Sequence, residues 1–293
     1  MSHPIKIDGH VVSQNILLEL TRGITQLKGI YQQPPGLAVI LVGDDPGSKA
    51  YVGRKKKACE QIGIRSFEYL LPATTSEQEL VTLIQCLNHN PDVHGILLQS
   101  PVPKHLNEQL LLDLIDPKKD VDGFHPVNVG RLLLGLDTFR SCTPWGIMEL
   151  LARYEISTQG KHVVIVGRSN IVGKPMAAML IQKEANATVT ICHSQTRDMK
   201  SVTNLADILI VAIGKPKFIT AEYVREGAVV IDVGMNRILD PTTKTGTRLV
   251  GDVDFDSVAP KSSLITPVPG GVGPMTIAML MKNTVKAYQQ FHS

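Results

Sequence analysis

A lysine in the N-terminal half of the sequence has surroundings suited to moving protons. Projected at about 100° per residue, Lys55 falls near the centre of an apolar arc of roughly 120°. Arg54 and Lys57 fall on the opposite side, Lys56 lies at the margin, and Tyr51 shares the arc one turn before Lys55. Burial lowers the pKa of a lysine towards values useful in proton transfer. The alternative is a lysine whose stem follows the edge of the core while its ammonium reaches water.

Other polar residues of this half have surroundings that suit ligand binding. Gln99 directly follows a buried strand expected at 95–98, and ligands of open α/β sheets bind beyond the carboxyl ends of the strands. Asp120 and Asp122 lie in a glycine-containing loop, and the carboxylate of one of them could accept paired N–H groups from an aminopyrimidine ring. Each has a structural alternative, since such glutamines often cap loops and such aspartates often form turns.

Residues 161–175, KHVVIVGRSNIVGKP, predict the first half of a dinucleotide-binding βαβ unit. The β-branched run at 163–166 is typical of a strand buried on both faces. Gly167 ends this strand, and Gly173 opens a segment with helical spacing, whose N-terminus offers free N–H groups to a pyrophosphate. The usual middle glycine is absent, so an ordinary tight turn is the alternative.

The charges around this turn favour NADP over NAD. An NAD site places Asp or Glu after the second strand, where the carboxylate binds the ribose 2′-hydroxyl. No acidic residue lies between the strand expected at 187–192 and Asp198. Ser194 and Arg197 occupy that stretch, and Arg168 lies on the first loop. A cationic pocket without a carboxylate suits a 2′-phosphate.

The composition is that of a globular enzyme. Of 293 residues, 43% are hydrophobic and 19% are charged, which excludes disorder and fits one large or two ordinary domains. A net charge of +3 without repeated basic blocks predicts no nucleic-acid partner. The four cysteines lack CxxC spacing and the nine histidines form no HxH or HExxH pattern, so we expect a reducing compartment and no metal. No signal core or membrane-length apolar run occurs, so we expect a cytoplasmic protein without membrane contact.

Strands and helices alternate along the chain and predict an α/β fold of two domains. Each domain is expected to be a largely parallel sheet flanked by helices, with the active-site cleft between them. Residues 1–140 plus 274–293 are expected to form the catalytic domain, with the C-terminal helix packing back, and 141–273 a Rossmann-like domain. Ser48 is expected to cap the helix that carries Lys55, and residues 240–247 are expected to form an exposed hairpin tip.

Residues 267–276, PVPGGVGPMT, combine glycines and prolines in a way that lets the backbone approach a flat ligand closely. An inter-domain hinge is the alternative.

Together these features resemble the bifunctional methylenetetrahydrofolate dehydrogenase/methenyltetrahydrofolate cyclohydrolase family over nearly the whole chain. Six motifs in the right order are far more specific than any one of them. They are Ser48-x-x-Tyr51-Val52-x-x-Lys55-x-Lys57, Gln99 before Pro-x-Pro, Lys119-Asp120-Val121-Asp122-Gly123, Gly167-Arg168-Ser169-x-Ile171-Val172-Gly173-x-Pro175, Cys192-His193-Ser194-x-Thr196 and residues 267–276. The sequence departs from the family pattern at Ser100, Ser141 and Met235, where an apolar residue, proline and isoleucine are usual.

The resemblance implies two reactions of one-carbon metabolism, which supplies purine biosynthesis. Hydride passes from 5,10-methylenetetrahydrofolate to NADP+, and water then opens the methenyl cation to 10-formyltetrahydrofolate. By analogy, Lys55 handles protons during hydrolysis, Tyr51 stacks on the folate, Gln99 tunes Lys55 and Asp122 anchors the pterin ring.

The resemblance also implies a homodimer and two sets of ligand contacts. The expected NADP contacts are Gly167, Arg168, Ser169, Ser194 and Met235. The expected folate contacts are Tyr51, Asp122, Pro269, Gly270 and Gly271.

Two other classes of protein remain as alternatives. A different NADP-dependent two-domain dehydrogenase, such as the shikimate dehydrogenase type, would lack the set Tyr51, Lys55, Gln99 and Asp122 at these places. A non-catalytic nucleotide-binding protein would be expected to have lost Lys55 or Asp122. Formation of the methenyl product from NADP+ and methylenetetrahydrofolate distinguishes all three.

Overall fold

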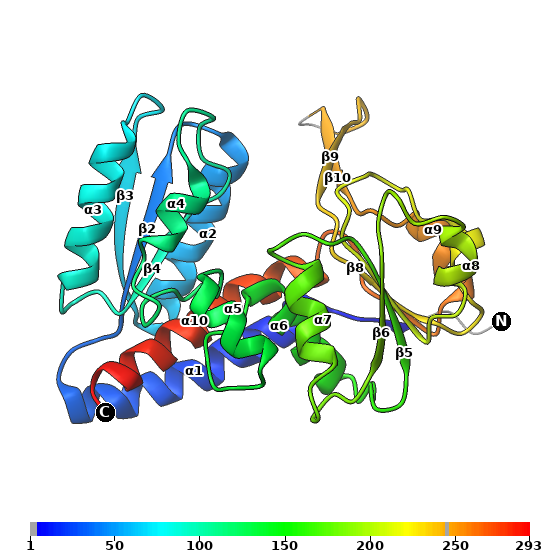
Figure 1. The fold of residues 1–293 in the computed structure, drawn as a ribbon, viewed down its shortest axis with the longest axis horizontal. Coiled ribbons are helices and arrows are strands. Elements are labelled where there is room, and N and C mark those ends of the chain that lie inside the picture. Colours follow the sequence, from blue (N-terminus) through cyan, green and yellow to red (C-terminus); the bar gives the residue numbers. More distant parts are fainter. Residues whose placement is uncertain (1–4, 244–245) are drawn as a thin grey trace. The chain divides into compact units, whose positions relative to one another are not determined.

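The computed structural model describes residues 5–243 and 246–293, and the chain divides into two compact units (Figure 1). The first unit comprises residues 14–142 and 277–293, and the second comprises the remaining described residues. The chain passes between the units within three helices: α1 (Gly9–Tyr31), α6 (Cys142–Arg153) and α10 (Val272–Phe291). These limits lie close to the expected ones at 141 and 274. Residues 5–13 differ, because they group with the second unit rather than the first.

A three-stranded parallel sheet forms the centre of the first unit, in the order β3 (Arg65–Leu71), β2 (Gly36–Val42) and β4 (Gly95–Leu98). The helix α2 (Pro46–Ile62) lies on one face and α3 (Glu77–His89) on the other (Figure 1). Every residue of β2 and β4 is buried, as expected for parallel strands covered on both faces. The buried strand expected at 95–98 is therefore confirmed.

Two short helices complete the first unit. The helix α4 (Glu108–Asp113) packs Leu111 into the core that β2, β4 and α3 share. The helix α5 (Pro126–Leu133), absent from the sequence-based expectation, follows the loop that carries Asp122. It begins at Pro126 and is capped by the preceding His125, whose ring Nδ1 accepts from the N–H of Val127 at 3.1 Å. Such a start is favourable because proline has no N–H to leave unpaired.

The second unit contains a six-stranded parallel sheet with helices on both faces. The helix α7 (Gly173–Leu180) covers one face, and α8 (Met199–Thr203) and α9 (Phe255–Val258) cover the other (Figure 1). The strand order is β1 (Ile5–Lys6), β11 (Leu264–Ile265), β8 (Val229–Asp232), β7 (Ile208–Val211), β5 (His162–Val166) and β6 (Thr188–Cys192). Because β1 pairs with β11, the N-terminal residues belong to this unit. The chain leaves β5 for β6 on one side and reaches β7 on the other, which makes the β5/β7 end the topological switch point where such sheets bind ligands.

An antiparallel pair, β9 (Asn236–Leu239) and β10 (Thr247–Val250), projects from the second unit (Figure 1). It forms the expected hairpin, although residues 244 and 245 of its tip lie outside the described residues. Two short 3₁₀ turns, η1 (Ala221–Tyr223) and η2 (Ala259–Lys261), complete the elements of this unit.

The described ranges contain no helix long and apolar enough to cross a membrane. Within residues 5–243 and 246–293, no group of three or more His, Cys, Asp or Glu side chains is arranged to hold a metal ion. All four cysteines are free thiols, and three of them, Cys59, Cys142 and Cys192, are buried.

Candidate functional site

The helix α2 presents Lys55 to the interior of the first unit. Its N-terminus is capped by Asp45, whose carboxylate accepts the N–H of Ser48 at 2.7 Å. The prediction that Ser48 is the cap was therefore wrong: Pro46 already occupies the first helical turn, so the cap lies earlier. Gly63 ends the helix in the left-handed conformation, with φ of 82°, which glycine adopts without strain.

Lys55 is buried, as the helical projection predicts. Its side chain is 4% exposed, whereas Arg54, Lys56 and Lys57 are exposed. Burial lowers the pKa of the Lys55 ammonium, and the nearby Asp122 carboxylate acts in the opposite direction. A buried lysine with a depressed pKa can exist as a neutral amine, the form that accepts protons.

Gln99 and Tyr51 contact the Lys55 ammonium. Nζ of Lys55 donates to Oε1 of Gln99 at 2.9 Å, and it lies 4.9 Å from the centre of the Tyr51 ring. The Gln99 amide is oriented by a second bond, from its Nε2 to the backbone carbonyl of Ser100 at 2.8 Å. The acceptor of that bond is a backbone carbonyl. The serine at position 100, where the family usually has an apolar residue, therefore leaves the orientation of Gln99 unchanged. The Ser100 hydroxyl donates instead to Glu108 at 2.7 Å, which ties the loop to α4.

The two aspartates of the 120–122 loop have different roles. Asp120 is buried, and its carboxylate accepts the N–H groups of residues 123, 124 and 125 at 3.2, 3.3 and 2.8 Å and the amide of Asn128 at 2.8 Å. Asp120 therefore shapes the turn. Asp122 is half-buried, and burial raises the pKa of its carboxyl to about 6, against the opposing charge of Lys55. The ligand-binding interpretation thus fits Asp122 and the turn-forming one fits Asp120.

A thiol that the sequence analysis treated only as an unpaired cysteine lies beside Asp122. Cys142 is 1% exposed, and its thiol donates to the carbonyl of Val121 at 3.4 Å. Burial, together with the nearby Asp122 carboxylate, raises the pKa of Cys142 well above its usual value. The thiol therefore stays protonated. The sequence gave only a weak signal that Cys142 belongs to the site. It directly follows Ser141, where proline is usual in the family, and it begins α6.

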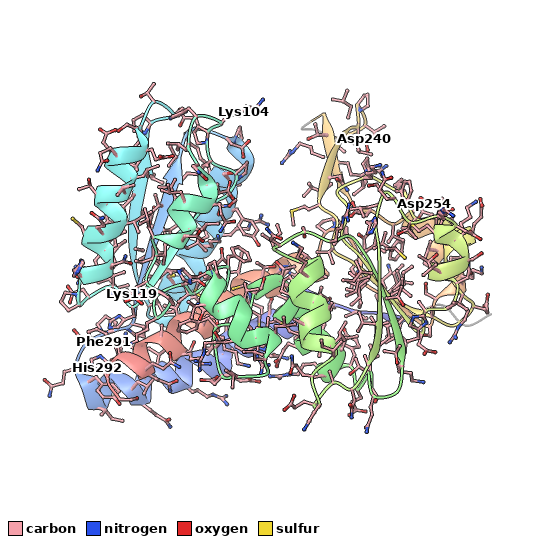
Figure 2. All side chains as sticks on the ribbon, viewed as in Figure 1. Lys104, Lys119, Asp240, Asp254, Phe291 and His292 are labelled. Atoms are coloured by element: carbon pink, nitrogen blue, oxygen red, sulfur yellow. The ribbon has the colours of Figure 1, made fainter. Side chains whose placement is uncertain are left out.

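Lys119, which belongs to the same sequence motif, has a structural role. Its ammonium donates to the carbonyls of Leu87 at 3.0 Å and Asn90 at 2.8 Å at the end of α3. It lines a cavity of about 840 Å³ together with Phe291, and Figure 2 shows both residues near the end of α10. Neither Lys55 nor Asp122 lines this cavity. Lys119 thus secures the C-terminus of α3.

The end of β5 requires glycine at two places. Gly167 has a φ of 130°, and a Cβ there would lie 2.1 Å from the carbonyl oxygen of Ala212, which follows β7. A Cβ on Gly173 would lie 2.2 Å from the carbonyl oxygen of Gly167. The hydroxyl of Ser169 accepts the N–H groups of Val172 at 3.1 Å and Gly173 at 3.4 Å. The two glycines therefore let the loop pack tightly on its own backbone and against Ala212 at the switch point.

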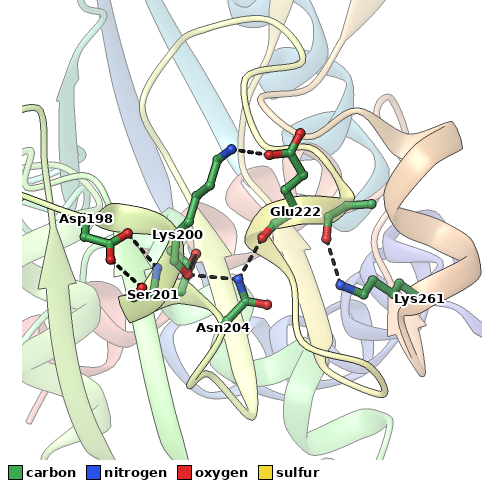
Figure 3. A network of polar contacts seen from close by, with 8 residues as sticks. Asp198, Lys200, Ser201, Asn204, Glu222 and Lys261 are labelled. Atoms are coloured by element: carbon green, nitrogen blue, oxygen red, sulfur yellow. Dashed lines mark hydrogen bonds and ion pairs between the residues drawn. The ribbon is translucent and has the colours of Figure 1, made fainter.

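The residues predicted to contact a 2′-phosphate lie at the surface of the second unit. Arg168, Ser194 and Arg197 are exposed. Asp198, the first acidic residue after β6, is engaged at the N-terminus of α8, where its carboxylate accepts the N–H of Ser201 at 3.2 Å and the Ser201 hydroxyl (Figure 3). Figure 3 also shows Lys200 paired with Glu222, so the acidic side chains of this region already have partners.

The remaining predicted contact residues belong to the second unit. Met235 follows β8 and is 46% exposed. Pro269 is exposed, Gly270 has a φ of 108°, and the carbonyl of Gly270 accepts the N–H of Gly9 at 2.9 Å. The glycines thus permit a close approach between this loop and the start of α1, because a Cβ on Gly9 would lie 1.8 Å from the carbonyl oxygen of Gly271.

The sequence matches two family models. Residues 7–122 match the catalytic domain of tetrahydrofolate dehydrogenase/cyclohydrolase, and residues 141–292 match its NAD(P)-binding domain. The bifunctional protein FolD of Chloroherpeton thalassium is 58% identical over 291 residues, covering 98% of this chain and 99% of that protein.

Solved structures agree with these matches. FolD from Campylobacter jejuni is 51% identical and superimposes with a TM-score of 0.92, covering 97% of this chain and 98% of its own. FolD from Trypanosoma brucei, complexed with NADP and an inhibitor, is 39% identical, with a TM-score of 0.94 and 99% of each chain covered.

Proposed function

Because the chain belongs to the tetrahydrofolate dehydrogenase/cyclohydrolase family, we propose that Lys55, held by Gln99, moves the protons of the second of its two reactions. The chain is a bifunctional enzyme of one-carbon folate metabolism. It oxidises 5,10-methylenetetrahydrofolate with NADP+ to the methenyl cation and hydrolyses that cation to 10-formyltetrahydrofolate. The other dehydrogenase type and the non-catalytic protein are thereby excluded.

The buried bond between Lys55 and Gln99 carries this proposal. Hydrolysis requires water to add to the methenyl carbon and lose a proton, and the C–N bond to break as the ring nitrogen gains one. A neutral amine can take the first proton and deliver the second, and the remaining hydroxyl proton leaves to solvent as the formyl C=O forms. Burial lowers the pKa of Lys55, which also avoids placing a second positive charge beside the methenyl cation. Gln99 accepts one N–H of the amine at 2.9 Å and so orients it.

Tyr51 and Asp122 would then hold the folate. The Tyr51 ring lies 4.9 Å from the Lys55 Nζ, so a folate ring stacked on it would lie near the amine. The Asp122 carboxylate, above its pKa of about 6, accepts a pair of N–H groups from the aminopyrimidine edge. Assaying the wild-type enzyme with methylenetetrahydrofolate and NADP+ tests this function: we expect NADPH and 10-formyltetrahydrofolate in equal amounts, and NADPH formation without hydrolysis would contradict it.

Acid should weaken folate binding through Asp122. The pKa of its carboxyl is raised to about 6, so the acceptor form predominates at neutral pH and is lost as the pH falls through 6. The KM for methylenetetrahydrofolate should therefore rise below pH 6 in the dehydrogenase assay, while the KM for NADP+ stays flat. Persistence of the same rise in Asp122→Asn would show that another group titrates.

Binding of NADP falls to the second unit in this proposal, and the family model assigns residues 141–292 to NAD(P) binding. Gly167 and Gly173 let the backbone of the loop after β5 pack closely, and Ser169 holds the turn that would lie against the pyrophosphate. Arg168, Ser194 and Arg197 would bind the 2′-phosphate, and the half-exposed Met235 would contact the cofactor through its apolar side chain. NADP supplies the acceptor for the hydride. The contacts of folate with Pro269, Gly270 and Gly271 stay a prediction from the resemblance.

Replacing Arg168 by alanine should raise the KM for NADP+ selectively. A charged hydrogen bond to phosphate contributes about 1.5–3 kcal/mol, which corresponds to roughly a ten- to hundred-fold change. The KM for NAD+ should change little, because NAD+ has no 2′-phosphate. Lys183→Ala, which removes an exposed cation beyond the far end of α7, is the matched control. Equal losses with both cofactors would overturn the assignment of the 2′-phosphate site.

A homodimer acting in the cytoplasm is the further proposal, supported by the resemblance and, for the reducing compartment, by the absence of CxxC spacing. Light scattering of the purified protein tests the first part, with a mass of twice 31.9 kDa expected. Fractionation of cells tests the second.

A further inference from the structure

Asn283 of α10 joins three segments of the first unit. Its side chain is 1% exposed, and its Nδ2 donates to the carbonyls of Val121 at 2.8 Å and Arg140 at 2.9 Å. The same nitrogen lies 3.7 Å from the sulfur of Cys142. A single amide thus links the C-terminal helix to the residue before Asp122 and to Cys142, whose thiol donates to the carbonyl of that same residue at 3.4 Å.

The contacts of this amide require its NH₂ group. Both main partners are carbonyl oxygens, which only accept hydrogen bonds, so the amide nitrogen must face them. The other atom, Oδ1, is then buried without a hydrogen-bond partner. A buried acceptor without a donor opposes folding, and the two bonds to Val121 and Arg140 must outweigh that penalty. The contribution of Asn283 therefore lies in the two bonds that it donates.

Asn283 holds the backbone segment that determines the position of the Asp122 side chain. Asp120 fixes the following turn through three backbone N–H groups. Gly123 has a φ of 75°, and a Cβ there would lie 2.7 Å from the carbonyl carbon of Arg140. Hydrogen bonds to Asp120, within the same segment, and to Asn283 of α10 thus fix the loop from both sides.

We propose that Asn283 is a positioning residue of the folate site, which acts by holding the loop so that Asp122 faces the pterin ring. This inference rests on the proposed role of Asp122. It extends the site to the C-terminal helix, from which no side chain was assigned to substrate binding.

Asn283→Asp tests the inference with nearly unchanged side-chain volume. The variant removes both donors and sets a carboxylate against two carbonyls, so the loop should shift. We expect the KM for the folate substrate to rise about tenfold in both reactions, with the KM for NADP+ unchanged. Asn283→Ser, which removes the same bonds without adding charge, serves if the first variant does not fold.

Thr284→Val is the matched control. Thr284 is fully buried and adjacent, but its hydroxyl donates within the helix to the carbonyl of Leu280 at 2.8 Å. The control should lower the melting temperature without changing the folate KM. A merely structural role for Asn283 would give that same pattern, and a folded Asn283 variant with unchanged folate KM would overturn the inference.

A double-mutant cycle with Asp122→Asn separates the positioning role of Asn283 from the folate-binding role of Asp122. If Asn283 acts through Asp122, the double variant should have a folate KM within about twofold of Asp122→Asn alone. A full additional rise in the double variant would overturn the inference while leaving the role of Asp122 standing. An unchanged folate KM in Asp122→Asn alone would instead contradict the proposed function.

Discussion

Lys55→Met is expected to abolish cyclohydrolase activity while most dehydrogenase activity remains. Methionine keeps the length and apolar stem of the side chain but removes the amine. Hydride transfer depends chiefly on the alignment of the folate carbon with the nicotinamide, whereas hydrolysis needs protons moved to and from water and the ring nitrogen. General acid–base assistance is worth roughly a hundred- to ten-thousand-fold, so the two activities, assayed separately, should diverge by about that factor.

Lys56→Met is the control for this experiment. Lys56 is exposed and pairs with Glu68 at 2.8 Å on the outside of α2, so its loss should leave both activities nearly unchanged. An essential Lys56 and a dispensable Lys55 would show that the proton-transfer role had been assigned to the wrong lysine. Equal loss of both activities in Lys55→Met would instead make Lys55 a binding residue.

Asp122→Asn is expected to impair both reactions. Asparagine keeps one acceptor oxygen but turns an NH₂ towards a substrate that also donates, so one hydrogen bond to a charged group is lost. The cost of such a loss is about 1.5–3 kcal/mol, or roughly ten- to hundred-fold in kcat/KM. This loss should appear as a higher KM for the folate substrate in both the dehydrogenase assay and the cyclohydrolase assay.

Asp113→Asn, an exposed position on α4, is the control and should be silent. If Asp122→Asn lost only hydrolysis, Asp122 would be a proton-transfer group and the anchoring role would be wrong.

The residues that sequence could place are those set by regular local structure. Lys55 was predicted to point inward because α2 is a continuous helix with a single apolar side, and the structure confirms its burial. The β5 strand was equally clear from the β-branched run at 163–166, and the structure confirms that these four residues are fully buried. Gln99 was located by its place at the end of β4.

The residues that sequence could not place depend on tertiary contacts. Asp120 and Asp122 are two residues apart in one loop, and their roles separate only because Asn128 and three backbone N–H groups bond to Asp120. Asn283 contacts Val121 across 162 residues of sequence, which no local pattern reveals. The assignment of the cap to Ser48 failed for a local reason, because Asp45 before Pro46 is a competing cap.

The ratio of methenyltetrahydrofolate to NADPH in one time course tests the division of labour at Lys55 most directly. The enzyme is mixed rapidly with NADP+ and methylenetetrahydrofolate, and both species are followed by their absorbance. In the wild type, methenyltetrahydrofolate should stay well below NADPH, because hydrolysis removes it. In Lys55→Met, the two should rise together in equal amounts. A Lys55→Met enzyme that forms NADPH yet still clears the methenyl species at the wild-type rate would contradict the account.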